Sequence, residues 1–203
     1  GNTTGCGYQD VRNLRLERSV ANEDVPHRFV ASGVYYLPFG KGRHWGSGLP
    51  ALADAVFGGW SLGSIVVYAT GRPYSPTVSG NPANTGTFGI VNRPNVVADP
   101  WAGTRTIDRD FNTAAFRQNS ALAFGNAGRN IISGPASLGL DTSLSKSFPI
   151  AEAHRVQLRF DAFNLPNRPD FSDPNATFTS PAFGRVQGAG GGRILQVSAK
   201  YLF

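Results

Sequence analysis

The sequence predicts an all-β fold, an antiparallel meander of about six long strands. Polar and apolar residues alternate along several runs of the chain, which is the side-chain period of an extended strand. The runs are longer than the roughly 5–6 residues of an ordinary strand and match a tilted strand that crosses a bilayer. Segments rich in Gly, Pro and Asn separate them, and the 203 residues include 25 Gly and 14 Pro. The pattern is typical of a transmembrane barrel wall, and also of a soluble two-sheet sandwich.

Taken in order, the expected strands lie near 11–18, 27–37, 60–70, 137–148, 155–165 and 193–203. The first alternates weakly, with only Leu14 and Leu16 on one face. The second and third are rich in β-branched and aromatic residues, as strands usually are. Between these two, residues 51–58 fit either one helical turn or a lead-in to the next strand.

The most regular stretch is an expected hairpin, because Pro149 ends one alternating run and a short link precedes the next. Apolar residues share one face of this hairpin and polar residues share the other. We expect the apolar face to contact lipid, through Leu138, Leu140, Leu144, Val156, Leu158 and Phe160. We expect the polar face to line a lumen, through Asp141, Arg155, Gln157, Arg159 and Asp161.

The lengths of the connections favour the barrel over the sandwich. Residues 71–135 and 168–192 read as long loops, which compact soluble domains seldom contain and outer-membrane barrels carry on their outer side. The 149–154 link is short, as inner turns are, whereas the 38–58 link is longer than ideal. If the long loops lie outside the cell and the 149–154 link lies on the periplasmic side, an aromatic girdle is expected at the periplasmic border of the membrane. It would comprise Tyr35, Phe39, Trp60, Phe148, Tyr201 and Phe203.

Composition excludes some classes of protein. The net charge of +6 comes from basic residues scattered along the chain without a cluster, so we expect no nucleic-acid partner. The single Cys6 has no partner for an internal disulfide or a zinc site. No apolar run approaches 18 residues and no signal peptide is visible at the start. A chain that opens on Gly1 rather than Met indicates a piece of a longer protein.

Candidate chemical motifs are weak. The Gly59–Gly63 segment fits the G-x-S-x-G nucleophile elbow, but here it enters a continuing strand instead of a strand–turn–helix. Residues 40–43 (GKGR) lack the fuller pattern of a phosphate loop. The three histidines, His27, His44 and His154, never share metal-ligand spacing. We therefore expect no enzyme activity, no metal and no cofactor; the row of Arg155, Arg159 and Asp161 is left open as a contact for an acidic ligand.

Several motifs also occur in a familiar order: HRFVASGVYYLPFGKGR, GGWSLGSIVVYATGRPYS, GNAGRNIISGP, LDTSLSKSFPI, RVQLRFDAFNLPNRPDF and a final KYLF. Together, over roughly residues 12–203, they resemble the C-terminal barrel of TonB-dependent outer-membrane receptors, and more narrowly the Oar-like subgroup. The resemblance implies a bacterial outer-membrane barrel of about 22 strands, plugged by an N-terminal domain, that imports a ligand with energy delivered through TonB. It also implies that the last strand, with Leu195, Val197, Tyr201 and Phe203, is read by the barrel-assembly machinery.

The chain departs from that family in lacking a plug domain and a TonB-contacting segment, so we expect contact with TonB only through a missing N-terminal part. The other expected partners are the lipid bilayer of the outer membrane, the assembly machinery and an imported ligand. That ligand is a siderophore, a glycan or a peptide, and the loop composition does not choose among them. The alternative function is a secreted soluble β-sandwich that binds, for example, carbohydrate.

Overall fold

The computed structural model describes residues 8–84 and 91–203, and the chain forms two compact units. We call the first the sheet unit; it comprises Arg28–Ala69, Leu138–Asp170 and Gly191–Phe203. We call the second the loop unit; it comprises Gly1–His27, Thr70–Ser137 and Phe171–Gly190. Cys6, singled out in the sequence, lies outside the described residues.

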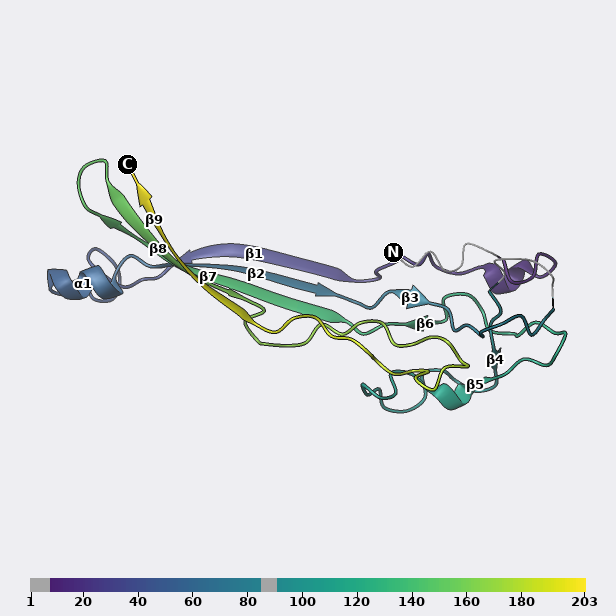
Figure 1. Cartoon of the computed structure of the whole chain (residues 1–203). Helices are drawn as coiled ribbons and strands as arrows, with labels where there is room; N and C mark the ends of the chain where they lie inside the picture. Colours follow the sequence, from purple (N-terminus) through teal and green to yellow (C-terminus); the bar gives the residue numbers. More distant parts are fainter. Residues whose placement is uncertain (1–7, 85–90) are drawn as a thin grey trace. The chain divides into compact units, whose positions relative to one another are not determined.

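The sheet unit is built on one five-stranded sheet in the order β1-β2-β7-β8-β9 (Figure 1). The pairings of β1 with β2, β7 with β8 and β8 with β9 are antiparallel. The strands are β1 (Arg28–Tyr36), β2 (Ser61–Ala69), β7 (Ser137–Pro149), β8 (Arg155–Phe163) and β9 (Ile194–Leu202). The described residues therefore contain five long strands, whereas about six were expected.

The expected strand near 11–18 is wrong, because the short 3-10 helix η1 (Leu14–Glu17) occupies this place. A tight turn leads into it, with the backbone N–H of Asn13 bonded to the carbonyl of Asp10, and the N–H of Leu16 within the helix bonds to the carbonyl of Asn13. Only two apolar residues alternate here, too few to fix a strand against a neighbour. The buried side chain of Glu17 makes polar contacts that set the local backbone instead.

Between β1 and β2 the chain forms the helix α1 (Ala51–Phe57), the first of the two alternatives expected for this segment. Three alanines favour a helix here because they lose no side-chain entropy. The helix ends at Gly58, whose backbone N–H bonds to the carbonyl of Asp54.

The register of the sheet sorts its side chains into two faces. Leu144 pairs with Phe160, and Phe160 pairs with Val197, so apolar residues of β7, β8 and β9 line up across three strands. We call this the apolar face; it carries Phe29, Tyr35, Trp60, Leu62, Val66, Tyr68, Leu138, Leu140, Leu144, Phe148, Val156, Leu158, Phe160, Leu195, Val197 and Tyr201. On β7, β8 and β9 the opposite, polar face carries Asp141, Ser143, Ser145, Ser147, Arg155, Gln157, Arg159, Asp161, Gln196, Ser198 and Lys200, with the apolar Phe163, Ile194 and Leu202 at the strand ends.

The long loops expected at 71–135 and 168–192 lie largely in the loop unit, which is folded around a small core. Within 71–135, β3 (Pro73–Tyr74) pairs with β6 (Ile132–Ser133), and β4 (Asn95–Val96) pairs with β5 (Phe116–Arg117). The 3-10 helix η2 (Thr113–Ala115) precedes β5. The buried core residues are Phe111, Ala115, Phe116 and Ile132, with Tyr74, Val96, Ile131, Phe178 and Phe183 packed against them.

Candidate functional site

The apolar face of the sheet is exposed over much of its area. Leu195 and Val197 are 69% and 68% exposed, and Phe29, Tyr35 and Tyr201 are also exposed. Soluble proteins seldom leave so large an apolar surface uncovered, and a two-sheet sandwich covers it with a second sheet. This exposure argues against the soluble sandwich.

All the hairpin residues selected from the sequence lie where the alternation placed them relative to one another. The six residues expected to face lipid share the apolar face, and Leu144 and Phe160 are direct partners. The five residues expected to face a lumen share the polar face, where Asp161 pairs with Ser143 and with Gln196. The assignment of these faces to lipid and to lumen stays a prediction.

On the polar face, charged and hydroxyl side chains have partners within the sheet. The Nε of Arg159 donates to Oδ1 of Asp161 at 2.7 Å, and Asp161 is buried. The hydroxyl oxygens of Ser61 and Ser145 lie 2.9 Å apart and join β2 to β7. Arg155, by contrast, is exposed and pairs only across the backbone with Pro149 and Leu202. Arg159 and Asp161, two of the three residues considered as a contact for an acidic ligand, therefore neutralise each other's charge.

Most of the predicted aromatic girdle gathers at one end of the apolar face. Tyr35 pairs with Leu62 near the start of β2, and Phe148 and Tyr201 both lie beside Val156 at the start of β8. The Tyr201 ring lies 5.9 Å from that of Phe203, between centroids, and its hydroxyl is 2.7 Å from Nδ1 of His154. Register thus places aromatic residues of separate strands at the same end of the sheet, and their position at a membrane border stays a prediction.

Lys146 of β7 lies on the apolar face opposite Leu158, and the sequence did not mark it as a functional candidate. Lys146 is 7% exposed, and its Nζ donates to the carbonyl oxygens of Ala55 at 2.6 Å and Asp54 at 3.1 Å. The same Nζ lies 5.0 Å from the ring centroid of Phe148 and 5.9 Å from that of Trp60. Its charge is therefore satisfied by the C-terminal carbonyls of α1 and by two aromatic rings.

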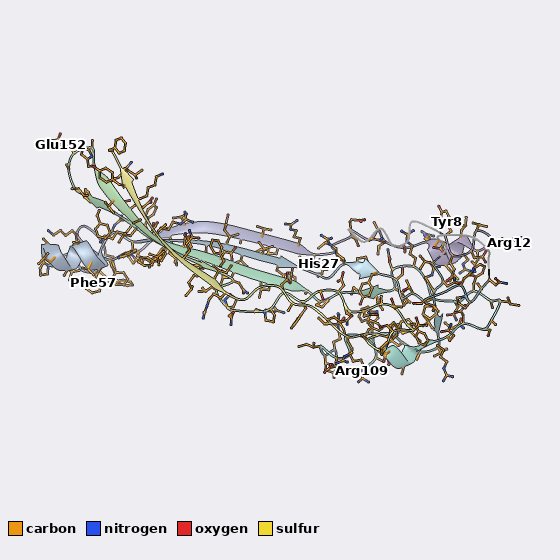
Figure 2. The ribbon with its side chains drawn as sticks, in the orientation of Figure 1. Tyr8, Arg12, His27, Phe57, Arg109 and Glu152 are labelled. Carbon is orange, nitrogen blue, oxygen red and sulfur yellow. The ribbon has the colours of Figure 1, made fainter. Side chains whose placement is uncertain are left out.

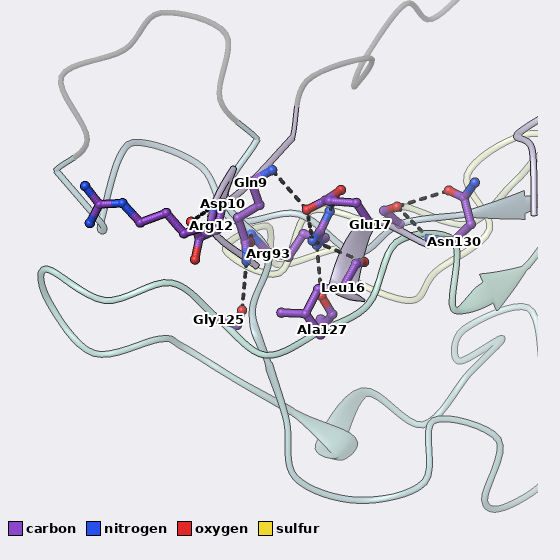
Figure 3. Close-up of polar contacts among 10 residues, drawn as sticks. Gln9, Asp10, Arg12, Leu16, Glu17, Arg93, Gly125, Ala127 and Asn130 are labelled. Carbon is purple, nitrogen blue, oxygen red and sulfur yellow. Dashed lines mark hydrogen bonds and ion pairs between the residues drawn. The ribbon is translucent and has the colours of Figure 1, made fainter. Parts of the chain in front are cut away.

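A second polar centre lies in the loop unit (Figure 3). Nη1 of Arg93 donates to Oε2 of Glu17 at 2.9 Å, and Nη2 donates to Oε1 at 2.5 Å. The side chain of Gln9 links the two chain segments further, because its Oε1 accepts from the backbone N–H of Arg93 and its Nε2 donates to the carbonyl of Gly125. This network holds η1 to the middle of the chain and has the features of a structural element.

The loop unit also contains an open cavity of about 330 Å³. Its lining comprises Val20, Asp24, Pro26, Thr70, Gly71, Pro73, Arg105, Ser133, Gly134 and Ala136. The charge of Arg105 is already paired, since Nη2 donates to Asp110 at 2.6 Å and to the carbonyl of Ser133 at 3.2 Å. Beside this pair, burial and the charges of Asp110 and Asp173 raise the pKa of Tyr74 above its ordinary value, so its hydroxyl stays neutral.

The remaining motifs have ordinary structural settings. Ser61 opens β2 and its hydroxyl bonds to Ser145, so the G-x-S-x-G segment leads into a strand. Gly40 and Gly42 both adopt positive φ in a turn that precedes α1.

Within residues 8–84 and 91–203 no group of His, Cys, Asp or Glu side chains is arranged to hold a metal ion. Over the same ranges no helix has the length and apolarity to cross a membrane. Figure 2 shows the side chains, including Phe57 of α1 and Glu152 of the 150–154 link.

Comparison with protein families gives one finding that covers almost the whole chain. A family model described as "Outer membrane beta barrel domain" matches residues 1–196. Comparisons with curated proteins and with solved structures give no match.

Proposed function

Because the chain belongs to the outer membrane β-barrel domain family, and so to a protein of the bacterial outer membrane, we propose that it serves a TonB-dependent receptor of the Oar-like subgroup. Its sheet is a segment of the barrel wall, and its loop unit contributes to capture of a ligand that the receptor takes up. The protein acts by binding and transport and catalyses no reaction of its own.

The observation that carries this proposal is the pair of unlike faces on β7, β8 and β9. An apolar face with exposed residues such as Val197 suits the hydrocarbon core of a bilayer. A polar face with paired charges such as Arg159 and Asp161 suits a wet lumen. The family match supports the same arrangement, because barrel walls alternate in this way along every strand.

Four partners follow from this proposal. The lipid bilayer meets the apolar face. The barrel-assembly machinery reads the last strand through Leu195, Val197, Tyr201 and Phe203. TonB contacts the N-terminal part of the receptor. The imported ligand is a siderophore, a glycan or a peptide, and nucleic acid is no partner because the basic residues are scattered.

The receptor class is supported by the motif resemblance and is tested separately from the barrel. The full protein in detergent is mixed with the purified periplasmic domain of TonB, and binding is measured by calorimetry. The proposal predicts saturable binding, which a competing TonB-box peptide abolishes. No binding at any concentration reached would contradict the receptor class, while the outer-membrane barrel assignment would stand on the family match.

A further inference from the structure

The connection between β1 and β2, residues 38–60, is an ordered structure of its own. The backbone N–H of Gly40 bonds to the carbonyl of Trp45, and the N–H of Trp45 bonds to that of Pro38, each at 2.9 Å. The Asp54 carboxylate accepts from the backbone N–H of Lys41 at 2.6 Å. These bonds close the turn onto α1 and fix the helix in one position relative to the strand ends.

Two side chains outside α1, Lys146 of β7 and Trp60 just before β2, bind the C-terminal carbonyls of the helix. Lys146 donates to Asp54 and Ala55, as described above, and Nε1 of Trp60 donates to the carbonyl of Val56 at 2.8 Å. Both side chains belong to the apolar face, at the end where the aromatic residues gather. The helix is therefore held on the same side of the sheet as the residues proposed to meet lipid.

The side chains that this connection exposes are apolar and basic. Leu52 is 85% exposed and Phe57 is 64% exposed, and Val56 and Trp45 are exposed as well. Lys41, Arg43 and His44 are also exposed, and Asp54, whose carboxylate is engaged with the Lys41 backbone, is the only acidic residue between 38 and 60. Exposed Leu, Val, Phe and Trp beside basic residues form the pattern of a segment that lies in a membrane interface.

We propose that residues 38–60 form an interfacial anchor on the outside of the barrel. Leu52, Val56 and Phe57 enter the boundary between headgroups and acyl chains of the phospholipid leaflet on the periplasmic side, and the basic side chains meet lipid phosphates. Lipid is the occupant because the exposed helix continues the apolar face, and because a basic segment complements phosphate. This inference rests on the proposed function, which assigns that face to lipid.

The test measures depth in the membrane. The full protein, with its native cysteines replaced, is labelled with a polarity-sensitive fluorophore at Phe57→Cys and reconstituted into vesicles of phosphatidylethanolamine and phosphatidylglycerol that carry brominated acyl chains. We expect quenching of at least twofold and a blue-shifted emission. Matched labels at Val197→Cys, on the apolar face, and at Asp108→Cys, in an exposed ion pair of the loop unit, give the quenched and unquenched references.

The outcomes separate the two proposals. An unquenched label at position 57 beside a quenched label at 197 would overturn the anchor and leave the lipid-facing assignment standing. Unquenched labels at both positions would overturn the proposed function and the anchor together.

A second variant tests the lysine tether. Lys146→Met removes the hydrogen bonds to α1, so quenching at position 57 should fall at least twofold while quenching at 197 is unchanged. Lys200→Met, on the polar face, is the matched control and should change neither. Equal quenching at position 57 with and without the Lys146 ammonium would show that this lysine does not hold the anchor in place.

Discussion

Arg93 and Glu17 lie 76 residues apart in the chain and meet through two hydrogen bonds between guanidinium and carboxylate. Their side chains are only 4% and 3% exposed. Because both charges are removed from water, each depends on the other for compensation. The pair therefore ties the N-terminal segment to the centre of the loop unit.

Removal of one partner should destabilise the loop unit strongly. Arg93→Met leaves the Glu17 carboxylate buried without its counter-charge, a loss of about 3–5 kcal/mol in comparable pairs. Hydrogen exchange of the segment around η1, measured in the full protein, should rise accordingly. Arg185→Met removes an exposed ion pair with Asp108 and should cost about 1 kcal/mol or less. A similar effect from both variants would contradict a special role for the buried pair.

The buried Arg93–Glu17 pair should make the stability of the loop unit sensitive to acid. Burial by itself raises the pKa of Glu17, but the hydrogen bonds from Arg93 and from the Gln9 backbone, with the charges of Arg93 and Arg129, outweigh it and hold the pKa below its ordinary value of 4.5. A lowered pKa in the folded state means that the stabilisation is present above the unfolded-state pKa and is lost as pH falls through the folded-state value.

Protection of the η1 segment from hydrogen exchange, corrected for intrinsic rates, should therefore fall from about pH 5 downward. In Glu17→Gln, which cannot titrate at this position, protection should be lower at neutral pH and should lose this acid step. An acid step of the same size in both proteins would assign it to other carboxylates.

The two faces of β7 should differ in their tolerance of charge. Leu140→Arg places a guanidinium on the apolar face of β7, at a cost of about 2–4 kcal/mol if that position meets the hydrocarbon core. Ser143→Arg places the same group on the polar face opposite Asp161 and should cost much less. The measurement is the fraction of full protein that reaches the folded, heat-modifiable form in outer membranes. Equal losses for the two variants would count against the assignment of the faces.

The 38–60 connection depends on close approach of backbone at Gly40. Its φ is +112°, and an added Cβ would lie 2.7 Å from both the Asp54 carboxylate and the Cα of Gly58. Gly40→Ala should open the connection, so that trypsin cleaves at Lys41 or Arg43 at least several times faster. Gly42→Ala, also at positive φ but with open space around it, should suffer only the conformational strain of about 1 kcal/mol. Cleavage at unchanged rates in Gly40→Ala would contradict the packing described.

The strands of the sheet unit could be predicted because the alternation of residue types that specifies each strand lies within the strand itself. In 137–148 four of the six even-numbered residues are apolar and the odd-numbered ones are small or polar, and such a period leaves one register that keeps the apolar set on one face. The structure accordingly places β7 at Ser137–Pro149 with Leu144 opposite Phe160. The aromatic cluster at one end of the sheet followed from the same alternation once the strand directions were set.

The loop unit was not predictable, because its contacts join residues far apart in a segment without period. Glu17 meets Arg93, and Phe183 packs against Phe111 and Phe116 with ring centroids 5.1 Å and 5.5 Å away. Nothing in the local sequence around 11–18 shows that a glutamate there will be buried. The role of Lys146 was hidden for a related reason, since its partners are backbone carbonyls of a helix about 90 residues earlier.

Whether one face of this sheet meets lipid can be measured residue by residue with a cysteine scan along β9. Fluorophores are placed in turn at 195, 196, 197, 198, 199 and 200 of the full protein in vesicles with brominated lipids. We expect alternation along the strand, with strong quenching at Leu195, Val197 and Ala199 and weak quenching at Gln196, Ser198 and Lys200. Uniform quenching along the strand, or strong quenching at the even positions, would contradict it.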